Sequence, residues 1–222
     1  MPIESNLLAM KQYLMRGISL FPILIATVSF ILFAGLGNTA FLFLFIGLGF
    51  LVPVLVYILN LVAGAALKNY PGLWSVRGAD CMFRNGSDGM KSAFPSYWMS
   101  GTVFFLVYFL LNAYTLYTRP AAENAPEDKV RLRKTQAAIA MVVVAIIGLV
   151  LIGMRFFSSS CETPIGAGIG IGVGCVAIWW FKVLQACSAD RLTDLFGIVN
   201  KIVPDSSTNR MKKICYPVAD EE

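Results

Sequence analysis

The sequence contains no histidine, and this absence removes several kinds of chemistry. Histidine is the commonest acid and base at neutral pH and the usual partner of a nucleophilic serine or cysteine. Ser-His-Asp sites, Cys-His sites and phosphohistidine intermediates are therefore excluded. The five cysteines include no closely spaced pair and the carboxylates are scattered, so we expect no metal site and no cofactor.

Charge is also scarce, because only 14% of the residues are charged while 57% are apolar, and the mean hydropathy is +0.70. A soluble domain of 222 residues with this composition would expose large apolar patches. The sequence therefore predicts an integral, multi-pass membrane protein whose first partner is the lipid bilayer. No nucleic-acid partner is expected.

Five apolar runs are long enough to cross a bilayer as helices. They are residues 17–36, 39–67, 98–117, 137–156 and 164–183. We therefore expect an all-α fold, a transmembrane helical bundle of about five spans within residues 17–186. Residues 1–16 form an N-terminal segment in which 7–14 is either a short interfacial helix or a continuation of the first span. Residues 187–222 form a polar C-terminal tail with an amphipathic helix at 192–203.

An odd number of spans places the two ends of the chain on opposite sides of the membrane. Face A then carries the N-terminus, the 68–95 loop and the 155–163 loop, whereas face B carries the 119–135 loop and the C-terminal tail. Of the 18 lysines and arginines, seven fall on face A and the other eleven on face B. This excess favours face B as the cytoplasmic side.

Two features of the face A loops agree with an external or lumenal position. Asn85-Gly86-Ser87 matches the glycosylation acceptor pattern, and Cys81 and Cys161 lie in two loops where an oxidising compartment would let them pair. The alternative is that Asn-Gly is only a turn and that both thiols are free.

Three short signals lie on face A in a fixed order. They are Lys68 and Arg77 after the second span, Pro95-Ser96-Tyr97-Trp98 at the start of the third, and Met154-Arg155 at the end of the fourth. This order resembles that of the type 2 phosphatidic acid phosphatase family of lipid phosphatases, over about residues 68–183. In that family the motifs are a lysine and arginine, Pro-Ser-Gly-His, and Ser-Arg followed by histidine and aspartate. The distance from Lys68 to Arg77 is two residues longer than the family's first motif.

The resemblance implies a phosphate site that has kept some positions and lost its reacting groups. Pro95, Ser96 and Arg155 match the second and third motifs. Trp98, Cys161 and Ile165 stand where the family has its general-acid histidine, its nucleophilic histidine and its orienting aspartate. We therefore expect vestigial phosphate-site positions and no catalytic residue.

The stretch FPSYWMS, residues 94–100, also has a purely structural interpretation. Pro95 would fix the start of the third span and Ser96 would cap its first turn. Tyr97 and Trp98 would anchor the helix at the membrane interface, where amphipathic rings are enriched. This interpretation needs no chemistry.

Five glycines alternate in PIGAGIGIGVG, at the start of the fifth span. The run lacks the Gly-Lys-Ser/Thr ending of a phosphate-binding loop. Gly166, Gly170 and Gly174 fall on one face of a helix, at the spacing that lets two helices approach closely. We expect these three residues to pack against another helix, within the chain or in a second subunit. The few polar residues within spans, Asn60 and Asn112, are expected to hydrogen-bond between helices.

Two classes of function follow from these observations. The first is a non-catalytic structural protein that links a lipid membrane to a protein assembly through the 119–135 loop and the C-terminal tail. The chain also looks similar to membrane proteins of large DNA viruses, which implies a minor capsid protein that anchors the inner membrane of a virion to its shell. The alternative is a membrane lipid phosphatase or lipid-handling enzyme on face A, in which Arg155 would favour a Cys161 thiolate and Glu162 would oppose it. A small transporter is a third, weaker interpretation, because ionisable groups are rare within the spans.

Overall fold

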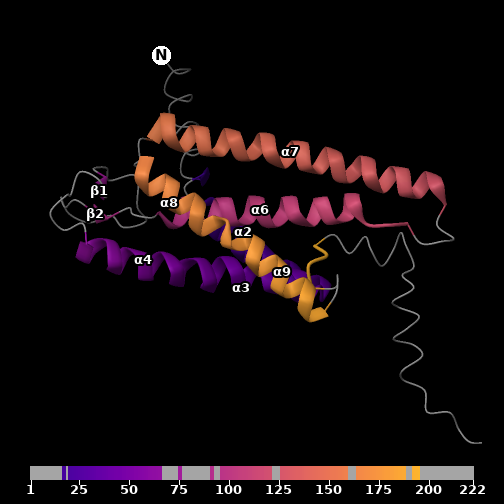
Figure 1. Cartoon of the computed structure of the whole chain (residues 1–222), viewed down its shortest axis with the longest axis horizontal. Coiled ribbons are helices and arrows are strands. Elements are labelled where there is room, and N and C mark those ends of the chain that lie inside the picture. The colour runs from indigo at the N-terminus through magenta and orange to yellow at the C-terminus, as the bar shows by residue number, and fades with distance from the viewer. Residues whose placement is uncertain are drawn as a thin grey trace, which may run out of the picture.

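The computed structural model describes residues 17–18, 20–66, 75–76, 91–92, 96–121, 126–159, 164–188 and 192–195. The helices are α2 (Phe21–Leu36), α3 (Thr39–Ile46), the π-helical η1 (Gly47–Leu51), α4 (Val52–Ala66), α6 (Tyr97–Thr118), α7 (Glu127–Ser159), α8 (Pro164–Gly174) and α9 (Val176–Ser188) (Figure 1). Two short strands, β1 (Ser75–Val76) and β2 (Lys91–Ser92), pair antiparallel. The all-α bundle expected from the sequence is confirmed, with this two-residue ladder as an addition. The interfacial helix expected at 7–14 lies outside the described residues.

Four helical stretches are long and apolar enough to cross a membrane, as expected of an integral membrane protein. They are Thr39–Ala63, Tyr97–Thr118, Glu127–Arg155 and Pro164–Cys187. The first predicted span is shorter, because α2 has 16 residues and is therefore about 24 Å long, whereas the hydrocarbon core is about 30 Å thick. The bundle thus has four full-length spans and one shorter apolar helix.

Successive spans run in opposite directions along the bundle, with α3–α4 forming one span and α8–α9 another. Figure 1 shows α4 and α7 ending, and α6 and α8 beginning, at the same end of the bundle. α2 begins near that end, where Pro22 lies against Gly101 of α6, and its other end leads to Asn38, which contacts Asp194 beyond α9. The chain therefore passes along the bundle five times, and the described helix ends fall into the same two groups as faces A and B.

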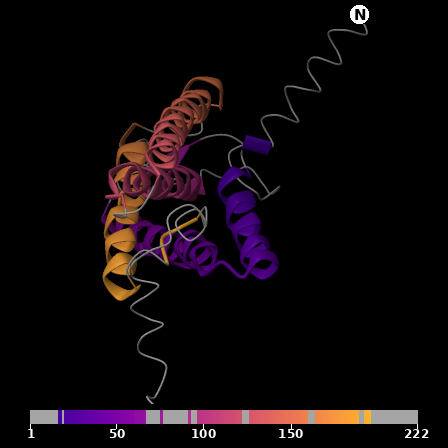
Figure 2. The ribbon, with the colours of Figure 1, turned by 90° about the vertical axis from the view of Figure 1, so that its right-hand side faces the viewer.

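Helix α6 occupies the centre of the bundle, because 61% of its most apolar stretch is buried, against 11% for α7. Figure 2 shows α2 and α8–α9 on opposite sides of a layer formed by α6 and α3–α4, with α7 outside. Within this core Phe104 and Tyr108 of α6 are fully buried. The Tyr108 ring meets Phe181 of α9 edge to face, with 5.2 Å between ring centroids. Most of the apolar surface of α7 is left for lipid.

The turn between α2 and α3 is built from Gly37 and Asn38. Gly37 adopts φ 65°, in the left-handed region that glycine enters without steric cost, and its N–H bonds Phe33 O at 2.8 Å. The Asn38 side-chain oxygen then accepts from Ala40 N at 3.0 Å and caps α3. Two residues therefore reverse the chain and satisfy both helix ends.

The second span changes its hydrogen-bond pattern halfway along. Between α3 and α4 the π-helical η1 carries one extra residue in its turn, and Val52 N bonds to Gly47 O. Gly47 faces α6 so closely that a methyl group there would lie 2.5 Å from Phe104 Cζ. The segment is therefore held tightly against the core at the point where its helix is irregular.

Helix α8 approaches α6 through two of the glycines named above. A methyl group at Gly170 would lie 3.0 Å from Met99 Cγ, and one at Gly174 would lie 2.5 Å from Val103 Cβ and 3.0 Å from Phe104 N. Gly166 is buried in the same helix. Gly168 and Gly172 have no neighbour within 4 Å of such a methyl group. Alternate glycines thus face α6 and open space.

Helix α7 is longer than a bilayer requires. Its 33 residues give a length of about 50 Å, and Figure 1 shows its first turns extending past the end of α6. Glu127 and Asp128 lie in its first turn, where carboxylates complement the helix dipole, as the charge order of this segment predicts. The charged start of α7 therefore projects from face B.

We predict that Gly174→Ala lowers the free energy of unfolding by about 1–3 kcal/mol, because the new methyl group meets a Cβ and a backbone nitrogen that cannot move aside cheaply. Gly172→Ala is the matched control, since its methyl group enters open space two residues earlier in the same helix. Thermal unfolding of both variants in detergent measures the difference. Equal stabilities would contradict the tight packing of α8 on α6.

Candidate functional site

The face A end of α6 begins with Ser96, Tyr97 and Trp98, which belong to FPSYWMS. The Ser96 hydroxyl accepts a hydrogen bond from Met99 N at 3.0 Å and so caps the helix. This is the structural role that the sequence suggested for it. Pro95 lies outside the described residues.

The Tyr97 hydroxyl satisfies a carbonyl of the second span. It donates to Leu48 O at 3.1 Å. In a π-helical turn that carbonyl would accept from residue 53, which is Pro53 and has no N–H, while Val52 N is already bonded to Gly47 O. Because an unpaired carbonyl in an apolar interior is costly, Tyr97 replaces the donor that Pro53 lacks.

Trp98 and Arg155 are brought together from two different predicted motifs. The Arg155 guanidinium carbon lies 5.1 Å from the centre of the Trp98 ring, and each residue is only 5% exposed. A desolvated cation over an aromatic face is stabilised by about 2 kcal/mol. The Trp98 indole N–H donates to Ile18 O at 2.6 Å, which ties the segment before α2 to α6. Trp98 therefore packs against Arg155 and joins two segments, and its side chain has no titratable group.

Of the other positions expected in a phosphate site, few lie within the described residues. The side chain of Ile165 is 46% exposed at the first turn of α8. Lys68, Arg77 and Cys161 lie outside the described residues, as does Cys81, the proposed disulfide partner. Cys175 and Cys187 are free, and the described residues hold no group of three or more cysteines and carboxylates that could bind a metal.

At the face B end of the bundle, residues 192–195 accept hydrogen bonds from two side-chain amides and one hydroxyl. Asn38 Nδ2 donates to Asp194 O at 3.0 Å, Tyr108 Oη donates to Leu192 O at 3.5 Å, and Asn112 Nδ2 donates to Thr193 O. Thr193 and Leu195 are 2% and 4% exposed, and Leu195 belongs to the main core cluster. We name this arrangement the tail clamp.

The tail clamp bears on two expectations. Asn112 and Asn60 were expected to bond between helices; Asn112 Nδ2 bonds the segment that follows α9, and Asn60 Nδ2 donates to Val56 O in its own helix at 2.9 Å. The tail was expected from residue 187; α9 ends at Ser188, and Thr193, Asp194 and Leu195 are buried in the bundle. Leu192 and Leu195, which flank two polar residues, were the available sequence signal. The rest of the predicted amphipathic helix, 196–203, lies outside the described residues.

We predict that Tyr97→Phe lowers the free energy of unfolding by about 1–3 kcal/mol, because Leu48 O loses its donor in an apolar environment. In a Pro53→Ala background the same change should cost less than about 1 kcal/mol, since an alanine at this position supplies the missing N–H. Thermal or denaturant unfolding of the four proteins of this double-mutant cycle gives both values. An equal cost of Tyr97→Phe in both backgrounds would contradict the assigned role of Pro53.

We also predict that Asn112→Leu speeds amide hydrogen exchange across residues 192–195 by about tenfold or more, because a lost bond of roughly 1.4 kcal/mol opens the clamp. Hydrogen exchange with mass spectrometry measures this effect in the full chain. Thr118→Val is the control, since Thr118 Oγ1 bonds Tyr114 O in its own helix at 2.9 Å. Unchanged exchange in Asn112→Leu would show that the clamp does not depend on Asn112.

Comparisons with known proteins identify no relative of this chain. No family model, no curated protein and no solved structure matches the chain. The two ends of the bundle carry its distinctive described features. Trp98 and Arg155 pack together on face A, and residues 192–195 are clamped on face B.

Proposed function

We propose that this chain is a non-catalytic structural membrane protein that links a lipid bilayer to a protein assembly on face B. The tail clamp is the observation that carries the proposal. Asn38, Tyr108 and Asn112 hold residues 192–195 at three consecutive carbonyls, so the remaining tail, 196–222, leaves from a point fixed to the core. A force that pulls on the tail would then act on α6 and on the turn between α2 and α3 as well as on α9.

The start of α7 offers a second attachment surface on the same face. Its first two turns carry charged side chains that are mostly exposed, including Lys129, Arg131 and Lys134. Arg133 is buried instead and donates to Arg119 O at 2.5 Å, which fixes the α6–α7 connection. A rigid, charged helix end beside an anchored tail suits contact with a protein layer next to the membrane.

The face A cluster supports a role without catalysis. Ser96 caps a helix, Tyr97 satisfies Leu48 O, and Trp98 donates to Ile18 O. Each polar group of this triplet therefore has a structural partner. A lipid phosphatase remains the competing function because Arg155 keeps a buried cation at this end.

The most specific form of the proposal is a minor capsid protein that anchors an inner viral membrane to an icosahedral shell. The resemblance described for the sequence suggests this form. A bundle with a fixed tail on one face has the geometry that such an anchor needs.

Two truncations test the tether. Ending the chain after Leu195 should leave membrane insertion and thermal stability nearly unchanged but release the protein from any detergent-resistant assembly, measured by sedimentation of extracted membranes from the native source. Ending it after Arg191 should also lower the melting temperature, because the donors of the tail clamp lose their acceptors. Retention of the Leu195-terminated chain in the assembly would contradict the proposal.

An activity measurement separates the tether from the enzyme. The full chain, purified in mixed micelles with phosphatidic acid, should release no phosphate above the protein-free control. Cys161→Ser is the diagnostic variant, because the family resemblance places residue 161 at the nucleophile. Phosphate release that this substitution abolishes would establish a lipid phosphatase instead.

A further inference from the structure

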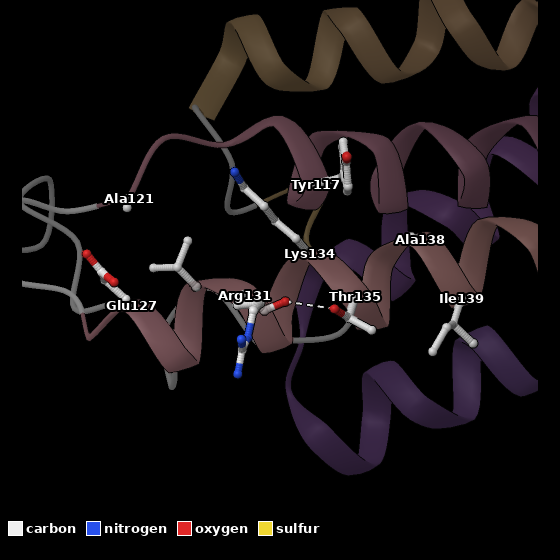
Figure 3. Close-up of a pocket in the computed structure, with 9 residues that line it drawn as sticks. Tyr117, Ala121, Glu127, Arg131, Lys134, Thr135, Ala138 and Ile139 are labelled. Atoms are coloured by element: carbon white, nitrogen blue, oxygen red, sulfur yellow. Dashed lines mark hydrogen bonds between the residues drawn. The ribbon is translucent and has the colours of Figure 1, made fainter.

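A groove on face B lies between the end of α6 and the first three turns of α7. It has a volume of about 630 Å³, within the range of ligand sites in proteins. The residues that line it are Tyr117, Ala121, Glu127, Val130, Arg131, Lys134, Thr135, Ala138 and Ile139. Figure 3 shows this groove and the side chains around it.

The lining changes character along α7. Arg131 and Lys134 are exposed and both line the groove, and their side chains leave the helix toward opposite sides in Figure 3. Val130, Ala138 and Ile139 supply apolar surface. Ile139 follows Lys134 by five residues, which is about 7.5 Å along the helix axis. The groove therefore places the basic side chains of Arg131 and Lys134, which we call its basic rim, next to the apolar side chains of Val130, Ala138 and Ile139, which we call its apolar floor.

Its position is that of the membrane boundary. The groove lies where the charged start of α7 gives way to the apolar run that begins at Ala137, on the face that carries most of the basic residues. Glu127 is the single carboxylate among the described residues that line it. Arg133, between Arg131 and Lys134 in the chain, is buried and donates to Arg119 O, and it adds a further positive charge to this end of α7.

We propose that this groove binds the phosphate of an anionic phospholipid, with the acyl chains lying along the exposed apolar side of α7. A neutral or soluble ligand fits less well, because the basic rim favours a negative group and the apolar floor favours a chain. Basic pockets at the ends of membrane helices hold anionic headgroups by this combination. The inference requires only that the chain inserts in a membrane and does not depend on the tether.

The test compares lipids that remain bound to the full-length chain released from nanodiscs, measured by native mass spectrometry. The nanodiscs contain phosphatidylcholine with a minor fraction of phosphatidylglycerol. The wild-type chain should retain phosphatidylglycerol in preference to phosphatidylcholine. The double variant Arg131→Gln/Lys134→Gln should lower this preference about tenfold or more, since it removes the two charged groups of the groove that would contact the phosphate.

Two controls separate a built site from general attraction. Lys129→Gln/Lys182→Gln removes the same charge from exposed positions outside the groove and should leave the preference unchanged. Ala138→Phe fills the apolar floor without changing charge and should lower retention of phosphatidylglycerol. An equal loss in both glutamine pairs, or full retention in Ala138→Phe, would overturn the proposal.

Two other occupants would also be detected. Displacement of the lipid by millimolar inorganic phosphate would identify a free-phosphate site and overturn the lipid assignment. If the wild-type chain retains no phosphatidylglycerol and Asp220→Asn/Glu221→Gln/Glu222→Gln restores its retention, then the acidic end of the chain fills the groove, and the proposal is wrong.

Discussion

Inside a bilayer, a backbone carbonyl without a donor costs several kcal/mol, because no water is present to replace the missing bond. This bundle meets that constraint with side-chain donors that reach from one element to another: Tyr97 bonds Leu48 O, and Trp98 bonds Ile18 O. Trp180 adds a second bond, of 3.2 Å, to Phe43 O, which also accepts from Gly47 N. The tail clamp applies the same interaction at the other end. The breaks in the helices therefore become the points at which the bundle is joined.

Under the same constraint, Ser96, Tyr97 and Trp98 of FPSYWMS each have a structural partner. Its serine, tyrosine and tryptophan each bond a different part of the chain: the first turn of α6, the π-helical turn of the second span, and the segment before α2. Arg155 then covers the Trp98 ring from α7. A few adjacent residues thus join α6 to three other parts of the bundle.

The two ends of the bundle differ in what they offer a partner. The described part of face A is closed by buried aromatic side chains. Face B combines the tail clamp, the projecting start of α7 and a basic groove between α6 and α7. Close packing of Gly170 and Gly174 on α6 holds α8 rigidly between the two ends. Among the described residues, the charged groove and the clamped segment therefore both lie on face B.

The sequence by itself determined that the chain is a helical membrane protein, roughly where its apolar spans lie, and that histidine chemistry is excluded, because hydrophobic run length and residue type carry this information locally. It also indicated that Gly166, Gly170 and Gly174 share a helix face and that Ser96 is a cap. Three contacts were decided only by the tertiary structure. Trp98 packs against Arg155, Tyr97 donates to the carbonyl that Pro53 cannot bond, and Asn112 donates to Thr193 O. These contacts join residues 49 to 81 positions apart. Spacing along one helix cannot report them, since they depend on how the helices are placed against one another.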